Sequence, residues 1–177
     1  ENHCNYLFEA SVGGGIPIIR PLNYSLTAEK LDAITGILNG TTNYILTKME
    51  EDGADFATVL KEAQEKGYAE RKPEADVEGY DACRKIAILS SLMKGETVNY
   101  EKIYTEGITK ITTADFAYAK KMNRTIKLLA MSKGTEDGFF AMVAPFMIPE
   151  EHPLFNVKGV FNAVYVHGNM LGDTMYY

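Results

Sequence analysis

The sequence predicts an α+β fold in which a mixed, largely antiparallel sheet is covered by helices. Three observations support this prediction. Helix-like and strand-like patterns follow one another without a regular strand–helix–strand period. Helical spacing dominates the middle of the chain, whereas the last third is rich in strand-like segments separated by glycine-containing turns. The length of 177 residues suits a single domain.

The first part of the chain is expected to be extended before the helices begin. Residues 6–12 have the aromatic and apolar content of a strand and lead into Gly13–Gly15. Residues 16–22 carry two prolines, so they are at most a short helix or an extended edge. Residues 30–38 show the alternation of a strand.

Capping residues and apolar spacing predict four helices. The first is capped by Asn39 or Thr41 and closed by Gly53, and the second is capped by Asp55 and followed by Gly67. The third runs from about Gly79 to Lys94 and is closed by Gly95, and the fourth covers Thr113 to Asn123 with Thr113 or Asp115 as the opening residue. Between the second and third helices, residues 71–77 form a polar connection. Three further strands are expected over residues 126–131, 139–143 and 160–167, with turns at Gly134, Gly138 and Gly159.

Composition excludes several classes of function. The net charge of −6 argues against a general nucleic-acid binder, which needs a basic surface. The longest apolar runs are too short for a membrane-spanning helix, so we expect no membrane partner. The two cysteines form no CxxC motif, which favours free thiols in a reducing compartment and hence a cytoplasmic location. The three histidines are scattered and do not have zinc-ligand spacing.

The third predicted helix carries the most informative pattern. Residues 86–93 are apolar on almost every face, which is typical of a buried helix. Asp81 and Lys85 are four residues apart and therefore share one face of its first turns. A buried helix that begins in this way brings a carboxylate and an ammonium group close to the interior. The alternative is an ordinary ion pair on an exposed turn, worth ~0.3–0.5 kcal/mol.

Two more acids lie just upstream of this helix, at Glu70 and Asp76. Several carboxylates around one lysine suit a zwitterionic substrate, because the acids hold an ammonium group while the lysine transfers a proton. The alternative assigns Glu70 to a solvated loop and Asp76 to a helix cap.

The glycine run at residues 13–15 allows the backbone to approach another group closely. It matches neither the GxGxxG dinucleotide pattern nor a phosphate-binding P-loop. Inward-turned carbonyl groups of such a loop can hold a hard cation, and a plain tight turn is the alternative.

Taken together, seven segments resemble the homoserine dehydrogenase family. They are FEASVGGGIPII (8–19), GILNGTTNYIL (36–46), GYAE (67–70), ADVEGYDA (75–82) followed by Lys85, EGIT (106–109), IKLLA (126–130) and NMLGDTMYY (169–177). The resemblance covers essentially the whole chain. One departure is Arg71-Lys72, where the family often has Ala-Asp.

This resemblance implies an oxidoreductase that interconverts L-homoserine and L-aspartate 4-semialdehyde with NAD or NADP, in the biosynthesis of threonine, methionine and isoleucine. It implies proton transfer by Lys85 and substrate binding by Glu70, Asp76 and Asp81. It also implies that Gly67 and Glu70 contact the nicotinamide cofactor.

The resemblance further implies a loop that binds a monovalent cation such as sodium through backbone oxygens of Glu9, Val12, Gly14 and Ile16. It implies a homodimer that forms through the sheet. We expect residues 1–177 to be the substrate-binding and dimerisation domain of a longer chain, inactive without its nucleotide-binding part. Two alternatives remain open: a non-catalytic amino-acid-binding or dimerisation module, and a lyase that forms a Schiff base at Lys85.

Overall fold

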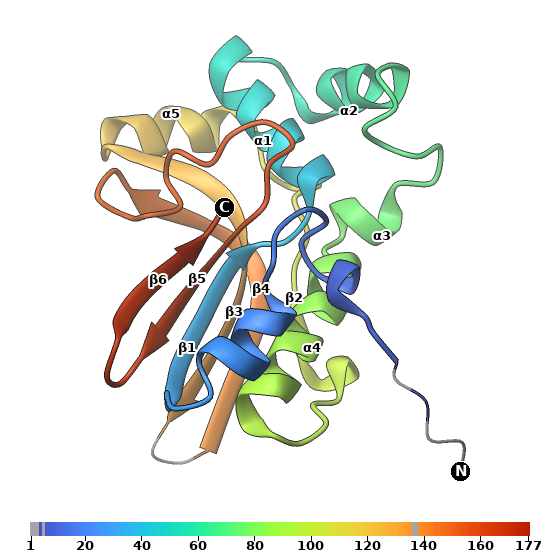
Figure 1. Cartoon of the computed structure of the whole chain (residues 1–177). Coiled ribbons are helices and arrows are strands. Elements are labelled where there is room, and N and C mark those ends of the chain that lie inside the picture. Colours follow the sequence, from blue (N-terminus) through green and yellow to red (C-terminus); the bar gives the residue numbers. More distant parts are fainter. Residues whose placement is uncertain (1–3, 5, 136–137) are drawn as a thin grey trace.

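The computed structural model describes residues 4, 6–135 and 138–177, and its centre is one open six-stranded sheet (Figure 1). In spatial order the strands are β2 (Tyr104–Thr105), β4 (Gly138–Pro149), β3 (Arg124–Thr135), β1 (Leu31–Ile37), β5 (Ala163–Gly168) and β6 (Gly172–Tyr176). The pair β2–β4 is parallel, and the four other neighbouring pairs are antiparallel. The expected α+β class and the mixed, largely antiparallel sheet are confirmed.

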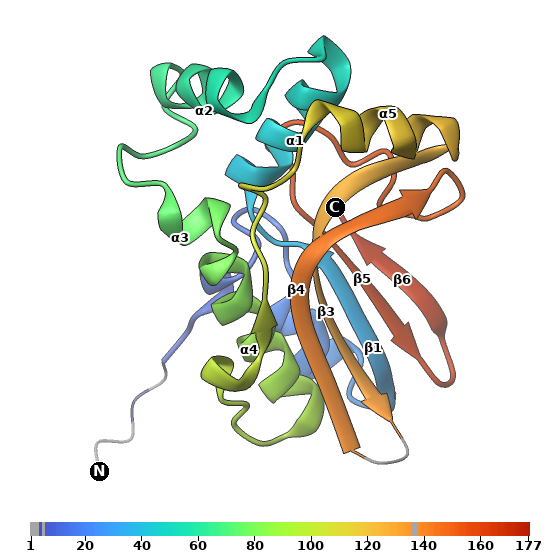
Figure 2. The same cartoon turned by 180° about the vertical axis from the view of Figure 1, so that it is seen from behind.

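The helices pack on one face and at one end of this sheet. They are α1 (Gly40–Asp52), α2 (Phe56–Glu65), α3 (Glu74–Val77), α4 (Tyr80–Lys94) and α5 (Thr113–Lys121), with short turns η1 (Glu9–Ser11), η2 (Pro21–Ser25) and η3 (Tyr100–Lys102). Figure 2 shows α4 running beside the strands, whereas α1, α2 and α5 gather at one end of the sheet.

Local capping explains where most helices begin and end. The side chain of Asn39 accepts a hydrogen bond from the backbone of α1, and that of Asp55 does the same for α2. Gly53 and Gly95 end their helices in the left-handed conformation, with φ of 64° and 72°. Helix α5 begins at Thr113, as predicted, but its cap is Thr112 rather than Thr113 or Asp115; the backbone N–H and the hydroxyl of Thr112 both donate to the Asp115 carboxylate.

The expected strand at residues 6–12 is wrong. Residues 9–11 form the 3₁₀ turn η1, and Tyr6 and Leu7 are exposed. The physical reason is that the Glu9 carboxylate accepts backbone hydrogen bonds from residues 18–20, at 2.7–2.8 Å, which fixes the segment as a turn. Residues 19–25 are helical, and the connection at 71–77 contains the short helix α3.

The later strands differ from their predicted bounds. β3 and β4 form a longer hairpin than the apolar runs indicated, and β5 begins at Ala163 because the preceding Val160 and Phe161 are exposed. Strands β2 and β6 were not predicted. Both are edge strands of the sheet. Edge strands are less buried than central strands, so their sequences show a weaker alternation of apolar and polar residues.

Alternation along the strands separates two cores. The helix-side core includes Ile34, Ile126, Leu128 and Val164 together with buried residues of α4. The loop-side core lies on the opposite face and consists of Ile37, Leu129, Ile148, Leu154, Val157 and Ala163. The segment 150–162 supplies part of this second core and therefore covers that face of the sheet.

Candidate functional site

The body of α4 is buried, as its apolar sequence predicts. Ile86 and Leu89 are fully enclosed in the helix-side core. The helix starts after Gly79, whose φ of 82° turns the chain into α4. Its first turns therefore emerge at the border between the core and the surface.

Lys85 is held at this border by two acceptors. Its Nζ atom lies 2.6 Å from Oδ2 of Asp81, and it donates a 3.0 Å hydrogen bond to the carbonyl oxygen of Leu38. The side chain of Lys85 is 22% exposed, so it reaches solvent but is not free in it. The contact with Leu38 connects α4 to the junction between β1 and α1, which an ordinary surface ion pair does not do.

Asn39, the residue after Leu38, connects the two acids. Its Nδ2 donates to Oδ1 of Asp76 at 2.7 Å and to Oδ2 of Asp81 at 2.9 Å. Its Oδ1 accepts from the backbone and the hydroxyl of Thr42. Sequence reasoning identified Asn39 only as a helix cap; the usable signal was that asparagine has two amide hydrogens left after its oxygen caps a helix.

The structure thus brings together Asp76, Asp81 and Lys85, from α3 and α4. Glu70 lies in the loop between α2 and α3 and is exposed. Among the described residues, no hydrogen bond or ion pair joins its carboxylate to this cluster; its backbone oxygen accepts from Gln64. Gly67, in the same loop, has a φ of 76° and open space around its Cα.

The glycine-rich loop also has a defined geometry. Gly13 and Gly15 have positive φ, and the carbonyl oxygen of Gly13 accepts from the backbone N–H of Ile16 at 2.9 Å. The Glu9 carboxylate is occupied by three backbone N–H groups. In the described ranges, no group of three or more His, Cys, Asp or Glu side chains could hold a metal.

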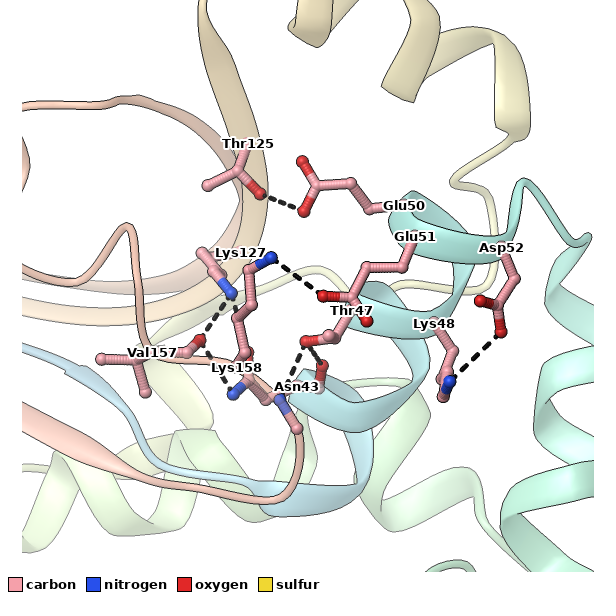
Figure 3. A network of polar contacts seen from close by, with 11 residues as sticks. Asn43, Thr47, Lys48, Glu50, Glu51, Asp52, Thr125, Lys127, Val157 and Lys158 are labelled. Carbon is pink, nitrogen blue, oxygen red and sulfur yellow. Dashed lines mark hydrogen bonds and ion pairs between the residues drawn. The ribbon is translucent and has the colours of Figure 1, made fainter.

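A second polar cluster lies on the loop side of the sheet (Figure 3). Lys127 of β3 is 1% exposed and donates to the carbonyl oxygen of Val157 at 2.6 Å and to Oδ1 of Asn43 at 3.3 Å. Burial lowers the pKa of Lys127 to about 8. Nearby, Glu51 of α1 forms an ion pair with Lys158 at 2.9 Å. The sequence signal for this cluster was a lysine inside an apolar strand pattern.

The described geometry therefore places Lys85 between a carboxylate and a carbonyl oxygen, with Asp76 tied to Asp81 through Asn39. Comparison with known proteins gives the family. Residues 17–177 match the sequence profile of homoserine dehydrogenase, and the chain belongs to the homoserine dehydrogenase family.

Individual relatives agree. A homoserine dehydrogenase of Synechocystis is 50% identical over 97% of this chain, which corresponds to 40% of that protein. The crystal structure of a homoserine dehydrogenase from Thiobacillus denitrificans superposes with a TM-score of 0.94 at 47% identity, over 96% of this chain and 39% of that one. A hyperthermophilic archaeal homoserine dehydrogenase in complex with NADPH has a TM-score of 0.80 at 30% identity, over 96% of this chain and 48% of that chain.

The chain therefore spans about 40% of the length of the curated relatives it matches. Within the residues that the structure describes, every helix is too short or too polar to cross a bilayer.

Proposed function

We propose that this chain supplies the substrate-binding and proton-transfer part of an enzyme that interconverts L-homoserine and L-aspartate 4-semialdehyde with NAD or NADP. The observation that carries the proposal is the placement of Lys85, held by Asp81 and Leu38 beside Asp76, in a chain of the homoserine dehydrogenase family. The pathway is then the cytoplasmic synthesis of the aspartate-derived amino acids.

The chemistry assigns one role to each member of the cluster. In homoserine oxidation, the hydroxyl proton passes to Nζ of a neutral Lys85 as the carbon–hydrogen bond breaks and the carbonyl forms. In the reverse direction the same ammonium group protonates the aldehyde oxygen. Asp76, Asp81 and Glu70 supply negative charge for the ammonium group of the amino acid.

NAD or NADP, when bound, accepts or supplies the hydride. Gly67 and Glu70 would contact it, and both fit this role because they are exposed and, among the described contacts, the Glu70 carboxylate has no polar partner. The described sheet is largely antiparallel, unlike the parallel sheets that bind dinucleotides. We therefore assign the main cofactor surface to another part of the complete gene product and expect this chain alone to be inactive.

The loop around Gly13–Gly15 would hold a monovalent cation through backbone oxygens of Glu9, Val12, Gly14 and Ile16. In the described part of the chain, the oxygens of Val12, Gly14 and Ile16 accept no hydrogen bond from backbone N–H groups, which leaves them available. The melting temperature of the chain should be higher in sodium or potassium chloride than in choline chloride at equal ionic strength. Equal melting temperatures would argue against this site.

We also assign a homodimer formed through the sheet. Strand β6 is an edge strand that pairs only with β5 among the described strands, and Met175 on it and Leu171 beside it are exposed. Size-exclusion chromatography with light scattering should give twice the mass of the chain. A monomer at micromolar concentration would contradict the assignment.

The decisive test is an NADPH-oxidation assay with L-aspartate 4-semialdehyde, run on the complete gene product and on this chain. We expect turnover only with the complete protein. Binding of homoserine without turnover by the complete protein would instead indicate a non-catalytic module. Trapping of the aldehyde on Lys85 by borohydride would indicate Schiff-base chemistry.

A further inference from the structure

We propose that Asn39 is a positioning residue for the proton transfer, because its carboxamide holds Asp76 and Asp81 in place and thereby sets where Lys85 points. This inference rests on the function proposed above. It assigns to Asn39 a role in the reaction in addition to capping α1.

The hydrogen bonds that its oxygen accepts fix the orientation of the Asn39 amide. Oδ1 accepts from the backbone N–H of Thr42 at 2.9 Å and from its hydroxyl at 3.0 Å. A flipped amide would set an NH₂ group against the N–H of α1 and an oxygen against two carboxylates, so the flipped state is unfavourable. Nδ2 must therefore face the acids.

Both amide hydrogens are then used on the site. One goes to Asp76 at 2.7 Å and the other to Asp81 at 2.9 Å. Two carboxylates that share one donor nitrogen lie close together and repel each other. The amide reduces this repulsion with two hydrogen bonds and adds no charge. Asn39 is itself only 6% exposed, so water has little access to replace it.

The junction at residues 38–39 contacts both members of the Asp81–Lys85 pair. The carbonyl of Leu38 accepts from Lys85 at 3.0 Å, and the side chain of Asn39 donates to the same Asp81 oxygen that accepts from Lys85. Two donors thus hold Asp81, and two acceptors hold Lys85. One short backbone segment fixes the separation of the pair.

The backbone next to the junction at residues 38–39 packs closely against a neighbouring segment of the chain. A Cβ atom at Gly40 would lie 2.6 Å from the carbonyl oxygen of Val160, so the backbone here packs tightly against the segment that precedes β5. Rigid support of this kind is what a group that positions a catalytic residue requires.

Two substitutions separate the positioning role from the capping role. Asn39→Asp and Asn39→Ser both keep a good N-cap acceptor, because Asp, Asn and Ser are nearly equal at this position. Asn39→Asp loses both amide donors and adds a negative charge. Asn39→Ser loses the donors and adds no charge. Asp55→Asn is the matched control, since it exchanges the same residue types at the cap of α2, away from the cluster.

In the complete enzyme we expect Asn39→Ser to lower kcat/KM for homoserine about 10- to 100-fold with an unchanged KM for the cofactor. We expect Asn39→Asp to lower kcat/KM for homoserine further and to change the pH profile of homoserine oxidation, because it adds a negative charge beside Asp76 and Asp81. The melting temperature of Asn39→Ser should stay within about 4 °C of wild type. Asn39→Asp should melt at a lower temperature, because it places a third carboxylate beside Asp76 and Asp81. Asp55→Asn should keep the wild-type kcat/KM and pH profile.

Wild-type kinetics and pH profiles in both Asn39 variants would overturn the proposal and leave Asn39 a simple cap. A loss of activity in Asn39→Ala but not in Asn39→Ser or Asn39→Asp would also show that Asn39 acts only as a helix cap. A crystal structure of Asn39→Ser gives a readout independent of turnover, in which the Asp81 and Lys85 side chains should move apart or turn. The two measurements can disagree. If the wild-type enzyme does not turn over homoserine but the Asp81 and Lys85 side chains move in Asn39→Ser, the proposed function fails and the positioning of the pair by Asn39 stands. Unmoved side chains would overturn the positioning itself.

Discussion

The ammonium nitrogen of Lys127 lies 2.6 Å from the carbonyl oxygen of Val157, and this contact fastens strand β3 to the segment that covers the loop-side core. Lysine is rarely buried so completely. Here the carbonyl and the Asn43 side chain replace water as hydrogen-bond partners.

The buried Lys127 predicts a specific pH dependence of stability. Burial lowers its folded-state pKa to about 8, below the ordinary value of 10.5. Between these values the unfolded chain holds more protons than the folded chain, so the free energy of unfolding rises with pH. Relative to Lys127→Met, wild type should gain roughly 2–4 kcal/mol between pH 7 and pH 10.5, measured by urea denaturation.

Lys158→Met is the control for this measurement. The ion pair with Glu51 raises the pKa of Lys158, so its contribution to stability is present below pH 10.5 and is lost only at higher pH. The stability difference between wild type and Lys158→Met should therefore change far less over the same window, because this variant keeps Lys127. A constant stability difference between wild type and Lys127→Met would mean that Lys127 is not desolvated.

Lys85 should be needed for turnover more than for binding. In the complete enzyme, Lys85→Met should lower kcat at least about 100-fold, because a general acid–base group contributes that much or more. The KM for homoserine should change far less. Lys94→Met, at the other end of α4, is the matched control and should keep the wild-type kcat. Unchanged turnover in Lys85→Met would remove Lys85 from the mechanism.

Asp81 should act on substrate binding in addition to holding Lys85. Asp81→Ala should raise the KM for homoserine, by about 10-fold or more, because a charge-assisted contact to the amino group is lost. The KM for the cofactor should stay constant in the same steady-state measurements. An effect confined to the cofactor would show that the assigned role is wrong.

Gly107 packs against the backbone at the end of α3, the helix that carries Asp76. A Cβ atom at this position would overlap the backbone of Val77 and Glu78, at the end of the helix that carries Asp76. Because backbone cannot yield as a side chain can, Gly107→Ala should destabilise the chain by about 2 kcal/mol or more in chemical denaturation. A Cβ atom at Gly134 would make only an ordinary van der Waals contact, 3.8 Å from the carbonyl oxygen of Asp32, so Gly134→Ala should change stability by less than about 1 kcal/mol. Similar values for both would contradict this packing argument.

Features set by local sequence were predictable. The caps at Asn39 and Asp55 and the stop at Gly53 depend on residues within one turn, and the Asp81–Lys85 pair depends only on helical spacing. The strand predicted from the aromatic and apolar composition of residues 6–12 alone was wrong. Residues 6–12 have strand-like content, yet the Glu9 carboxylate binds N–H groups about ten residues away.

Features set by distant contacts were not predictable. The bridge from Asn39 reaches 37 and 42 residues along the chain, and Lys127 reaches Val157 across 30 residues. Family resemblance suggested roles for Asp76 and Glu70, and these remain predictions. Only the folded geometry shows that Asn39 links Asp76 to Asp81, and that the Glu70 carboxylate has no contact with the cluster among the described residues.

The acceptor that Leu38 offers to Lys85 belongs to the main chain. No substitution of the side chain at position 38 deletes this peptide oxygen. The contact between Lys85 and Leu38 therefore survives any side-chain exchange that keeps this backbone, whereas the contact with Asp81 does not. A redesign of this scaffold for other polar substrates can vary the exposed Glu70 and keep the lysine held by both Leu38 and Asp81.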